Sequence, residues 1–362
     1  MTDRTIAILP GDGIGPELAD ACAPVLADVF PGWQLQPAEI GWRCWCSGGD
    51  PVPAATWRVL ESADAALLVA VTSKPARAAE AELAPALQNT GLRYRSPVLQ
   101  LRTRLDLHAN IRPIRLADGT VVTIARENTE GLYAHDLAGS ELGDELRGII
   151  GSDVTVQHSA PADLAVALRV TTRYGWARLL RTAASLTTRG EVTIADKPNI
   201  LQSSGEVILA AVDDVAPEFP EVRFTMANVD VVAMKMVTDP GAYDVIAAEN
   251  VFGDVLSDLG AGLMGSLGLA AAANIGAQHA VFEPVHGSAP DIAGQGVANP
   301  AAFLEAAAMC GDHLGDASEA ARLRSAVAKA LEDPSARTPD VGGHGTTETF
   351  VAAVRSALGS AR

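Results

Sequence analysis

The stretch Glu249-Asn-Val-Phe-Gly-Asp-Val-Leu-Ser-Asp-Leu259 carries two acidic residues, Asp254 and Asp258, four positions apart. In a helix, residues with this spacing share one face, with Cβ atoms roughly 5–6 Å apart. Two ionised carboxylates held so close repel each other unless a divalent cation takes oxygen ligands from both. A solvated acidic face is the commoner origin of such a pair, but the apolar neighbours of this one indicate a packed helix. The stretch therefore predicts a metal site.

The composition of the chain is that of a large globular protein. Its 362 residues are 48% hydrophobic, so it can bury a large core, and its length suggests two domains or one elaborate domain. With 27 basic and 44 acidic residues, the formal charge is −17. This balance argues against a general polyanion binder, so we expect no nucleic-acid partner.

Neither export nor membrane insertion is indicated. The chain runs directly into the strand-like residues 5–9 without a signal-type hydrophobic region, and no apolar run approaches the roughly 20 residues that span a bilayer. The four cysteines are sparse, and Cys44 and Cys46 lack the further ligands of a zinc site. We expect a soluble, cytoplasmic protein without a membrane partner.

Strand-like and helix-like stretches alternate along the chain. We expect strands at residues 4–9, 65–71, 107–114, 121–126, 191–196 and 222–226, and helices at 15–30, 97–104, 171–184 and 205–215. Such alternation is typical of an α/β fold with a largely parallel sheet. The polar, Gly-rich stretch 134–170 is either an arm that pairs with a second subunit or an ordinary surface insertion, and its composition alone favours the insertion.

The turn Leu9-Pro-Gly-Asp-Gly-Ile-Gly-Pro-Glu17 joins the first expected strand to the first expected helix. Its glycines follow a G-x-G-x-G spacing and Pro16 comes next, which differs from the dinucleotide-binding fingerprint. We therefore interpret it as a turn that shapes a corner and not as a Rossmann loop.

Three arginines, Arg102, Arg112 and Arg126, lie near the ends of expected helices and strands. Taken singly, each is more often a surface residue, but arginine binds carboxylates through two parallel hydrogen bonds. If the three converge beside the acidic pair, they form a site for a substrate with several carboxylates.

Two further residues are candidates for proton transfer. Lys197 ends an expected strand, and a lysine near a metal and other cations can have its pKa lowered and act as a base, although a surface lysine is commoner. Tyr133 could donate a proton, although most tyrosines only pack and hydrogen-bond. The stretch 281–294 is rich in Gly, Pro and Ser; it is either a ligand-binding loop or, as composition favours, a plain connection.

Together these motifs resemble those of the β-decarboxylating dehydrogenases, which comprise the isocitrate, homoisocitrate, 3-isopropylmalate and tartrate/malate dehydrogenases. The matching segments follow the family's order and cover nearly the whole chain: residues 9–17, 101–113, 126–133, 196–199, 228–230, 250–258, 283–300 and 342–350. The resemblance implies an α/β fold of two domains around a central cleft. Residues 1–103 and 255–362 would form the large cofactor-binding domain. Residues 104–254 would form the small domain with the dimer interface, including a clasp-like arm at about 134–170.

The resemblance also implies roles for the residues singled out above. Arg102, Arg112 and Arg126 would bind the malate carboxylates. Tyr133 would protonate C3 after carbon dioxide leaves, and Lys197 of the partner subunit would assist removal of the hydroxyl proton.

For the metal, the resemblance implies Mg²⁺ or Mn²⁺ held by Asp254 and Asp258 together with Asp230 of the partner subunit. The active protein would then be a homodimer with shared active sites.

A further set of residues is implied to bind the cofactor: Thr72, Asn250, Glu283, His286, Gly287, Ser288, Ala289, Pro290, Asp291, Ile292 and Asn299. The carboxylate of Asp291 can accept hydrogen bonds from a ribose 2′-hydroxyl and repels a 2′-phosphate. The family's NADP-dependent isocitrate enzymes have Lys then Tyr where this chain has Asp291 and Ile292, so we expect NAD.

The segment before Arg102 would face the substituent at C3 of the substrate. The apolar Leu-Leu pair and glutamate of isopropylmalate enzymes are not evident there, whereas Arg95-Ser96 resembles the isocitrate pattern. Val98 and Leu99 replace the asparagine of isocitrate enzymes and the arginine of homoisocitrate enzymes. We therefore expect an anionic C3 group, as in isocitrate or a close analogue such as homoisocitrate or phosphonomethylmalate. The alternatives are a 3-isopropylmalate dehydrogenase and a non-catalytic regulatory subunit of the same fold.

Overall fold

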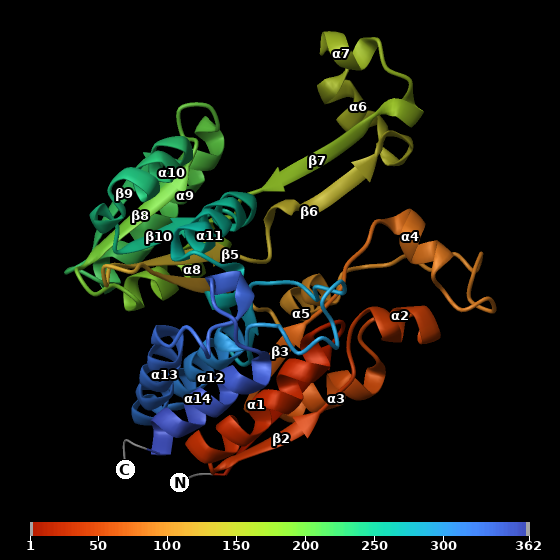
Figure 1. Ribbon diagram of the computed structural model, residues 1–362. Coiled ribbons are helices and arrows are strands. Elements are labelled where there is room, and N and C mark those ends of the chain that lie inside the picture. The colour runs from red at the N-terminus through yellow and green to blue at the C-terminus, as the bar shows by residue number, and fades with distance from the viewer. Residues whose placement is uncertain (1–2, 360–362) are drawn as a thin grey trace.

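The computed structural model describes residues 3–359 and has helices on both faces of one long sheet (Figure 1). The strands of the described residues are β1 (Arg4–Gly11), β2 (Trp33–Pro37), β3 (Ala65–Ala70), β4 (Ala109–Arg115), β5 (Val121–Glu127), β6 (Gly131–Ala138), β7 (Ala165–Val170), β8 (Glu191–Asp196), β9 (Arg223–Asn228), β10 (Val245–Ala248), β11 (Ala271–Ile275) and β12 (Ala280–Pro284). The α-helices are α1 (Gly15–Val29), α2 (Trp42–Gly48), α3 (Ala54–Ser62), α4 (Ala76–Ala81), α5 (Pro97–Arg104), α6 (Asp144–Ile150), α7 (Val154–Gln157), α8 (Arg173–Ser185), α9 (Gln202–Val215), α10 (Val229–Thr238), α11 (Asn250–Met264), α12 (Ala301–Leu314), α13 (Ala317–Glu332) and α14 (Thr347–Gly359). Among residues 3–359, every helix is too short or too polar to span a bilayer.

The predicted α/β fold is confirmed, and its sheet is mixed. Ten strands run in the order β2-β1-β3-β12-β11-β4-β5-β10-β8-β9. Six of the nine neighbouring pairs are parallel, and the three antiparallel pairs, β12–β11, β11–β4 and β4–β5, lie together at the centre. Two of these three pairs are hairpins, because the connections from β4 to β5 and from β11 to β12 are too short for a parallel crossover.

Alternating side chains of the strands enter different cores. Ile6 and Ile8 of β1 pack in one apolar cluster with α1, α8 and α12, whereas Ala7 and Leu9 pack on the other side with α3 and α5. This is the period of two that a strand buried on both faces requires. Helix α12 is buried almost throughout, and its alanines let it lie close against β3, β11 and β12.

The sheet is continuous between the two regions that we predict to be separate domains. Strands β4, β5, β8, β9 and β10 come from residues 104–254, the other five come from the rest of the chain, and β11 pairs with β4 across the division. The division into two domains stays a prediction. Helix α11 crosses the predicted boundary at residue 254 as one element.

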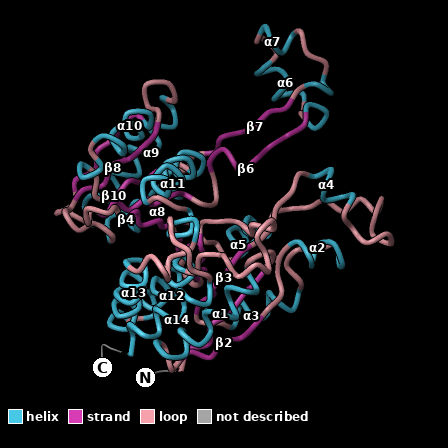
Figure 2. Tube along the Cα trace, viewed as in Figure 1, coloured by secondary structure: helices cyan, strands magenta, loops and turns pink. Residues whose placement is uncertain are grey.

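A separate two-stranded sheet forms an arm. Strands β6 and β7 pair antiparallel and carry the short helices α6 and α7 at their far end. In Figures 1 and 2 this arm projects away from the body of the molecule. The stretch whose composition favoured an ordinary insertion is therefore an arm, and its pairing with a second subunit stays a prediction.

Candidate active site

The acidic pair lies on α11, as its spacing predicts, and faces the arginines. Arg112 on β4 donates to both carboxylates, from Nη2 to Asp254 Oδ1 at 3.4 Å and from Nη1 to Asp258 Oδ1 at 3.2 Å. Arg126 on β5 donates from Nη1 to the same oxygen of Asp254. Tyr133 on β6 donates its hydroxyl to Asp254 Oδ2 at 3.2 Å. Asp254 is therefore the centre of a charged cluster built from three strands and one helix.

Helix α11 is capped by Glu249, a residue that was not predicted to have a role at the site. The Glu249 carboxylate accepts hydrogen bonds from the backbone N–H groups of Val251 and Phe252, which caps the helix. The same carboxylate accepts the backbone N–H of Leu132 at 2.7 Å, so it also ties the arm to the helix. The signal was an acidic residue directly before a helical stretch, where it complements the helix dipole.

The three arginines converge, and all three are buried. Arg126 is 2% exposed, and Asn250 accepts from its Nε and Nη2 at 3.1 and 2.8 Å. Burial, reinforced by the charges of Arg102 and Arg112, lowers the pKa of Arg126 to about 9, so it still carries its charge at neutral pH. Burial also lowers the pKa of Arg102. Arg102 makes no side-chain hydrogen bond to any described residue, and its buried Nε has no partner. A buried guanidinium with free donors indicates a site for an anion.

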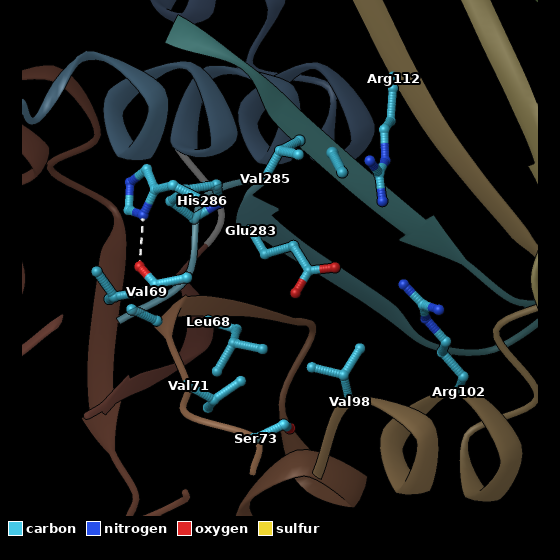
Figure 3. Close-up of a pocket in the computed structure, with 14 residues that line it drawn as sticks. Leu68, Val69, Val71, Ser73, Val98, Arg102, Arg112, Glu283, Val285 and His286 are labelled. Atoms are coloured by element: carbon cyan, nitrogen blue, oxygen red, sulfur yellow. Dashed lines mark hydrogen bonds between the residues drawn. The ribbon is translucent and has the colours of Figure 1, made fainter. Parts of the chain in front are cut away.

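Two adjoining cavities meet at Arg102 and Arg112. The larger, of about 560 Å³, is lined by Ser96, Val98, Leu99, Arg102, Arg112, Arg126, Leu132, Tyr133, Asp136, Ala167 and Asp254. The smaller, of about 220 Å³, shares Val98, Arg102 and Arg112 with it and adds Glu283, His286 and Gly287 (Figure 3). In Figure 3 the Glu283 carboxylate points toward the side of the pocket where the two arginines lie. The structure thus brings the three arginines together beside the loop that the resemblance assigns to the cofactor, and the binding of both ligands stays a prediction.

Of the two residues predicted to contact the C3 substituent, only one lines the larger cavity. Ser96, directly before α5, lines the larger cavity, and its Oγ accepts a hydrogen bond from Ser73 Oγ at 3.2 Å. Arg95 does not line it; its guanidinium is exposed and donates to Thr103 Oγ1 at 3.3 Å. The cavity wall beside Ser96 is instead apolar.

The stretch after β12 contacts the glycine turn near the N-terminus. Ser288 accepts the backbone N–H of Ile14 at 2.9 Å, and its Oγ lies 2.5 Å from Thr72 Oγ1. Gly13 has a φ of +57°, and a Cβ there would lie 1.9 Å from the Ser288 oxygen, so only glycine fits. The turn is therefore a corner that receives this loop, as we interpreted it.

The other predicted cofactor residues are spread along this loop and beyond it. Burial lowers the pKa of His286. Ala289 has a φ of +36°, Asp291 is exposed, and Ile292 packs against the core. Pro290 is also exposed.

Two predicted cofactor residues have their side chains occupied within the protein. Asn299 donates to Asp340 Oδ2 at 3.0 Å and accepts from the Ala301 backbone N–H at 3.0 Å. Asn250 holds Arg126 and donates to the Glu130 carbonyl at 2.8 Å, so in this chain it serves the arginine cluster.

Lys197 and Asp230 form a pair of their own. Lys197 Nζ lies 2.5 Å from Asp230 Oδ1, and this hydrogen bond holds the pKa of the carboxyl below its usual value. Neither residue lines the two cavities. Their predicted contribution to the active site of a second subunit stays a prediction.

The chain matches the family model described as isocitrate/isopropylmalate dehydrogenase over residues 5–354. The chain belongs to the isocitrate/isopropylmalate dehydrogenase family. It is 40% identical to an isocitrate/homoisocitrate dehydrogenase of Thermus thermophilus, over 98% of each chain. It is 41% identical to protein DlpA of Legionella pneumophila over 96% of its own length, and it spans only 58% of that protein. Among solved structures, an isocitrate dehydrogenase from Methylococcus capsulatus matches with a TM-score of 0.83 and 33% identity, over 98% of this chain and 99% of the other.

Members of the isocitrate/isopropylmalate dehydrogenase family are oxidative decarboxylating dehydrogenases of isocitrate, homoisocitrate or isopropylmalate type, and they generally use NAD(P) and a divalent metal. In this chain the acidic pair fits a hard cation in part. Two carboxylates on one helical face supply oxygen ligands, and the side chain of Asp258 is 61% exposed and therefore accessible. Within residues 3–359 of one chain, no group of three His, Cys, Asp or Glu side chains could hold a metal ion.

Proposed function

We propose that this chain catalyses the NAD- and divalent-metal-dependent oxidative decarboxylation of a 3-substituted malate. The observation that carries the proposal is the convergence of three buried arginines and Asp254 on one cavity beside the Glu283 loop, with Asp258 ion-paired to one of these arginines, Arg112. A substrate for such a site needs at least two carboxylates and an oxygen that a hard cation can bind.

The residues of this chain have distinct tasks in the proposed reaction. Arg102, whose donors are free, and Arg126 hold the malate carboxylates, and Arg112 joins them while keeping Asp254 and Asp258 in place. A bound nicotinamide would supply the hydride acceptor for C2, and a divalent metal held by Asp254 and Asp258 would supply the Lewis acid that favours loss of the β-carboxylate.

Tyr133 supplies the proton at C3 after carbon dioxide leaves. Burial and the charge of Asp254 raise the pKa of its hydroxyl, so the hydroxyl keeps its proton at neutral pH. Lys197 of the partner subunit takes the hydroxyl proton in a homodimer with shared sites, and Asp230 of the partner subunit completes the metal ligands. The exposed Asp291 carboxylate on the loop favours NAD over NADP.

For the substituent at C3, we propose an anionic group, as in isocitrate or a close analogue such as homoisocitrate or phosphonomethylmalate. Ser96 lines the cavity and can donate a hydrogen bond to such a group, and Arg102, in the last turn of α5, lines the same cavity with unpaired donors. The name of the Thermus thermophilus relative agrees with this choice.

A second candidate substrate is 3-isopropylmalate. Val98, Leu99, Leu132 and Ala167 give the cavity an apolar wall that suits a branched alkyl group, and Arg95 lies outside the cavity. A non-catalytic regulatory subunit is the remaining alternative, and it predicts binding of the acid without turnover.

An assay of NADH formation with Mn²⁺ and a panel of 3-substituted malates tests the proposal. We expect turnover of at least one member, lost on removal of the metal by a chelator. Higher kcat/KM for isocitrate than for 3-isopropylmalate supports the anionic group, and the reverse order supports the alkyl group. Binding without turnover of every member would overturn the proposal in favour of a regulatory subunit.

A further inference from the structure

Three buried asparagines lie on or directly after the central strands of the sheet: Asn110 on β4, Asn274 on β11, and Asn128 just after β5. Asn110 on β4 is 0% exposed, and Asn128 and Asn274 are each 2% exposed. A buried amide costs free energy unless its donors and acceptors are paired. None of the three was predicted as a site residue, although a polar residue within the apolar strand 107–114 was a visible signal.

A continuous chain of hydrogen bonds runs through two of these asparagines. Arg112 Nε donates to Asn110 Oδ1, Asn110 Nδ2 donates to Asn274 Oδ1, and Asn274 Nδ2 donates to Glu283 Oε1, each at 2.8 Å. The sheet places these residues in line. Asn110 lies opposite Asn274 in the β4–β11 pair, and Asn110 and Arg112 share one face of β4 because they are two residues apart.

The two end residues, Arg112 and Glu283, fix the direction of this chain of hydrogen bonds. A guanidinium can only donate hydrogen bonds and an ionised carboxylate can only accept them, so Arg112 and Glu283 fix the orientation of both amides between them. Asn274 is held further, since its Oδ1 accepts from Asn128 Nδ2 at 3.0 Å and its Nδ2 also donates to the Val281 carbonyl at 3.3 Å. Neither amide can rotate to the opposite orientation without losing partners.

One end of this hydrogen-bond chain reaches both cavities, and the other end reaches only the smaller one. Arg112 contacts Asp254 and Asp258 and lines both cavities, whereas Glu283 lines only the smaller one, beside His286. Figure 3 shows Arg112 and Glu283 at the same pocket, and their strands β4 and β12 flank β11, which carries Asn274. If the proposed function holds, Arg112 serves the acid and Glu283 serves the cofactor.

We propose that Asn110 and Asn274 are positioning residues that couple binding of the hydroxyacid to binding of the cofactor. This coupling rests on the proposed function. Neither ligand alone fully orders the residues that bind it. A cofactor bound against Glu283 holds Asn274, which holds Asn110 and so fixes the Nε edge of Arg112 for the acid. By thermodynamic reciprocity, the acid improves cofactor binding by the same factor.

Two conservative variants each remove one hydrogen bond in the chain between Arg112 and Glu283. Asn110→Asp still accepts from Arg112 Nε but has lost the donor to Asn274. Asn274→Asp still accepts from Asn110 and Asn128 but has lost the donor to Glu283. The matched control is Thr56→Val, which removes one buried hydrogen bond, from Thr56 Oγ1 to the Glu39 carbonyl, on α3 and outside both cavities.

The decisive measurement is the effect of each variant on the KM of the remote ligand. We expect N110D to raise the KM for NAD, and N274D to raise the KM for the acid, each by about fivefold, with T56V changing neither. If N110D changes only the KM for the acid and N274D only that for NAD, each asparagine serves its own pocket and the coupling is overturned.

A ligand-free measurement tests the link independently of the reaction. Urea denaturation of N110D, Glu283→Gln and the double variant forms a cycle between the two ends of the chain. We expect the double variant to be more stable than the sum of the single effects, because E283Q removes a carboxylate that N110D leaves facing excess negative charge. Additive effects would overturn the link even if the enzyme is active, whereas absence of turnover by the wild type would overturn only the proposed function.

Discussion

The Asp254 cluster and the Lys197–Asp230 pair differ in how much of a site each makes alone. The cluster is built from α11, β4, β5 and β6 of one chain, and its arginines are buried. The pair consists of two neighbouring surface side chains, with the Asp230 side chain 62% exposed, and neither residue lines the two cavities of the candidate site. A buried cluster of charges costs desolvation free energy that must be offset by its partners, whereas an exposed pair costs little and contributes little. The folded chain therefore holds a buried group of arginines that is arranged for an anion, whereas Lys197 and Asp230 stay on its surface. This arrangement is expected if Lys197 and Asp230 complete a site only on another subunit.

Removal of the acid at the centre of the cluster should have the largest effect. Asp254→Asn leaves three charged or polar partners without their anion and removes a proposed metal ligand. Since a bound metal contributes several kcal/mol to the transition state, we expect kcat to fall by about a thousandfold. Steady-state assays with Mn²⁺ check this, and Asp20→Asn, an exposed acid on α1, is the control that should keep wild-type activity. If D254N keeps a tenth or more of the activity, the cluster is not the metal site.

A mixed dimer tests whether the two regions complete each other across subunits. Lys197→Met and D254N should each be inactive as homodimers. A heterodimer purified through two different tags should regain about half of the wild-type activity, because one of its two sites then has every residue intact. Restoration must fail when D254N is paired instead with Tyr133→Phe, since Tyr133 and Asp254 act in the cluster of their own chain and each of the two sites then keeps one defect. No gain in the first heterodimer would mean that Lys197 does not act on the partner's cluster.

Within the cluster, Tyr133 should matter for proton transfer more than for binding. Its hydroxyl contacts Asp254, and burial raises its pKa, so it is a proton donor at neutral pH. We expect Tyr133→Phe to lower kcat by about a hundredfold with little change in the KM for the acid. The enzyme-catalysed exchange of the C3 proton of the 2-oxo acid product in D₂O, followed by NMR, should also be lost. Exchange at the wild-type rate would exclude Tyr133 as the donor to C3.

The sequence predicted the cluster better than it predicted the polar groups that support it. The spacing of Asp254 and Asp258 implied a shared helical face, and the arginines were recognisable by type. Glu249, Asn110 and Asn274 were missed, because their importance depends on pairing between strands far apart in the chain. The mixed centre of the sheet was missed for the same reason, since the short strands β10, β11 and β12 carry few periodic signals.

The smallest expected effect concerns the stability that the exposed pair contributes. The hydrogen bond from Lys197 lowers the pKa of Asp230 from its ordinary 3.8. A carboxyl whose pKa is lowered by folding stabilises the folded state above the pKa of the unfolded chain, and this stabilisation is lost as the pH falls through the folded pKa. The difference in unfolding free energy between the wild type and Asp230→Asn should thus be constant from pH 7 to about 4 and shrink below that. For a pair exposed to solvent this difference is small at every pH.

If a second subunit covers the pair, solvent screening falls, and the difference in unfolding free energy at pH 7 must grow as the protein concentration is raised through the range in which dimers form. Urea unfolding at pH 7, 5 and 3 and at two protein concentrations separates these cases. A small difference in unfolding free energy that does not change with protein concentration would mean that the pair lies at a free surface, outside any shared site.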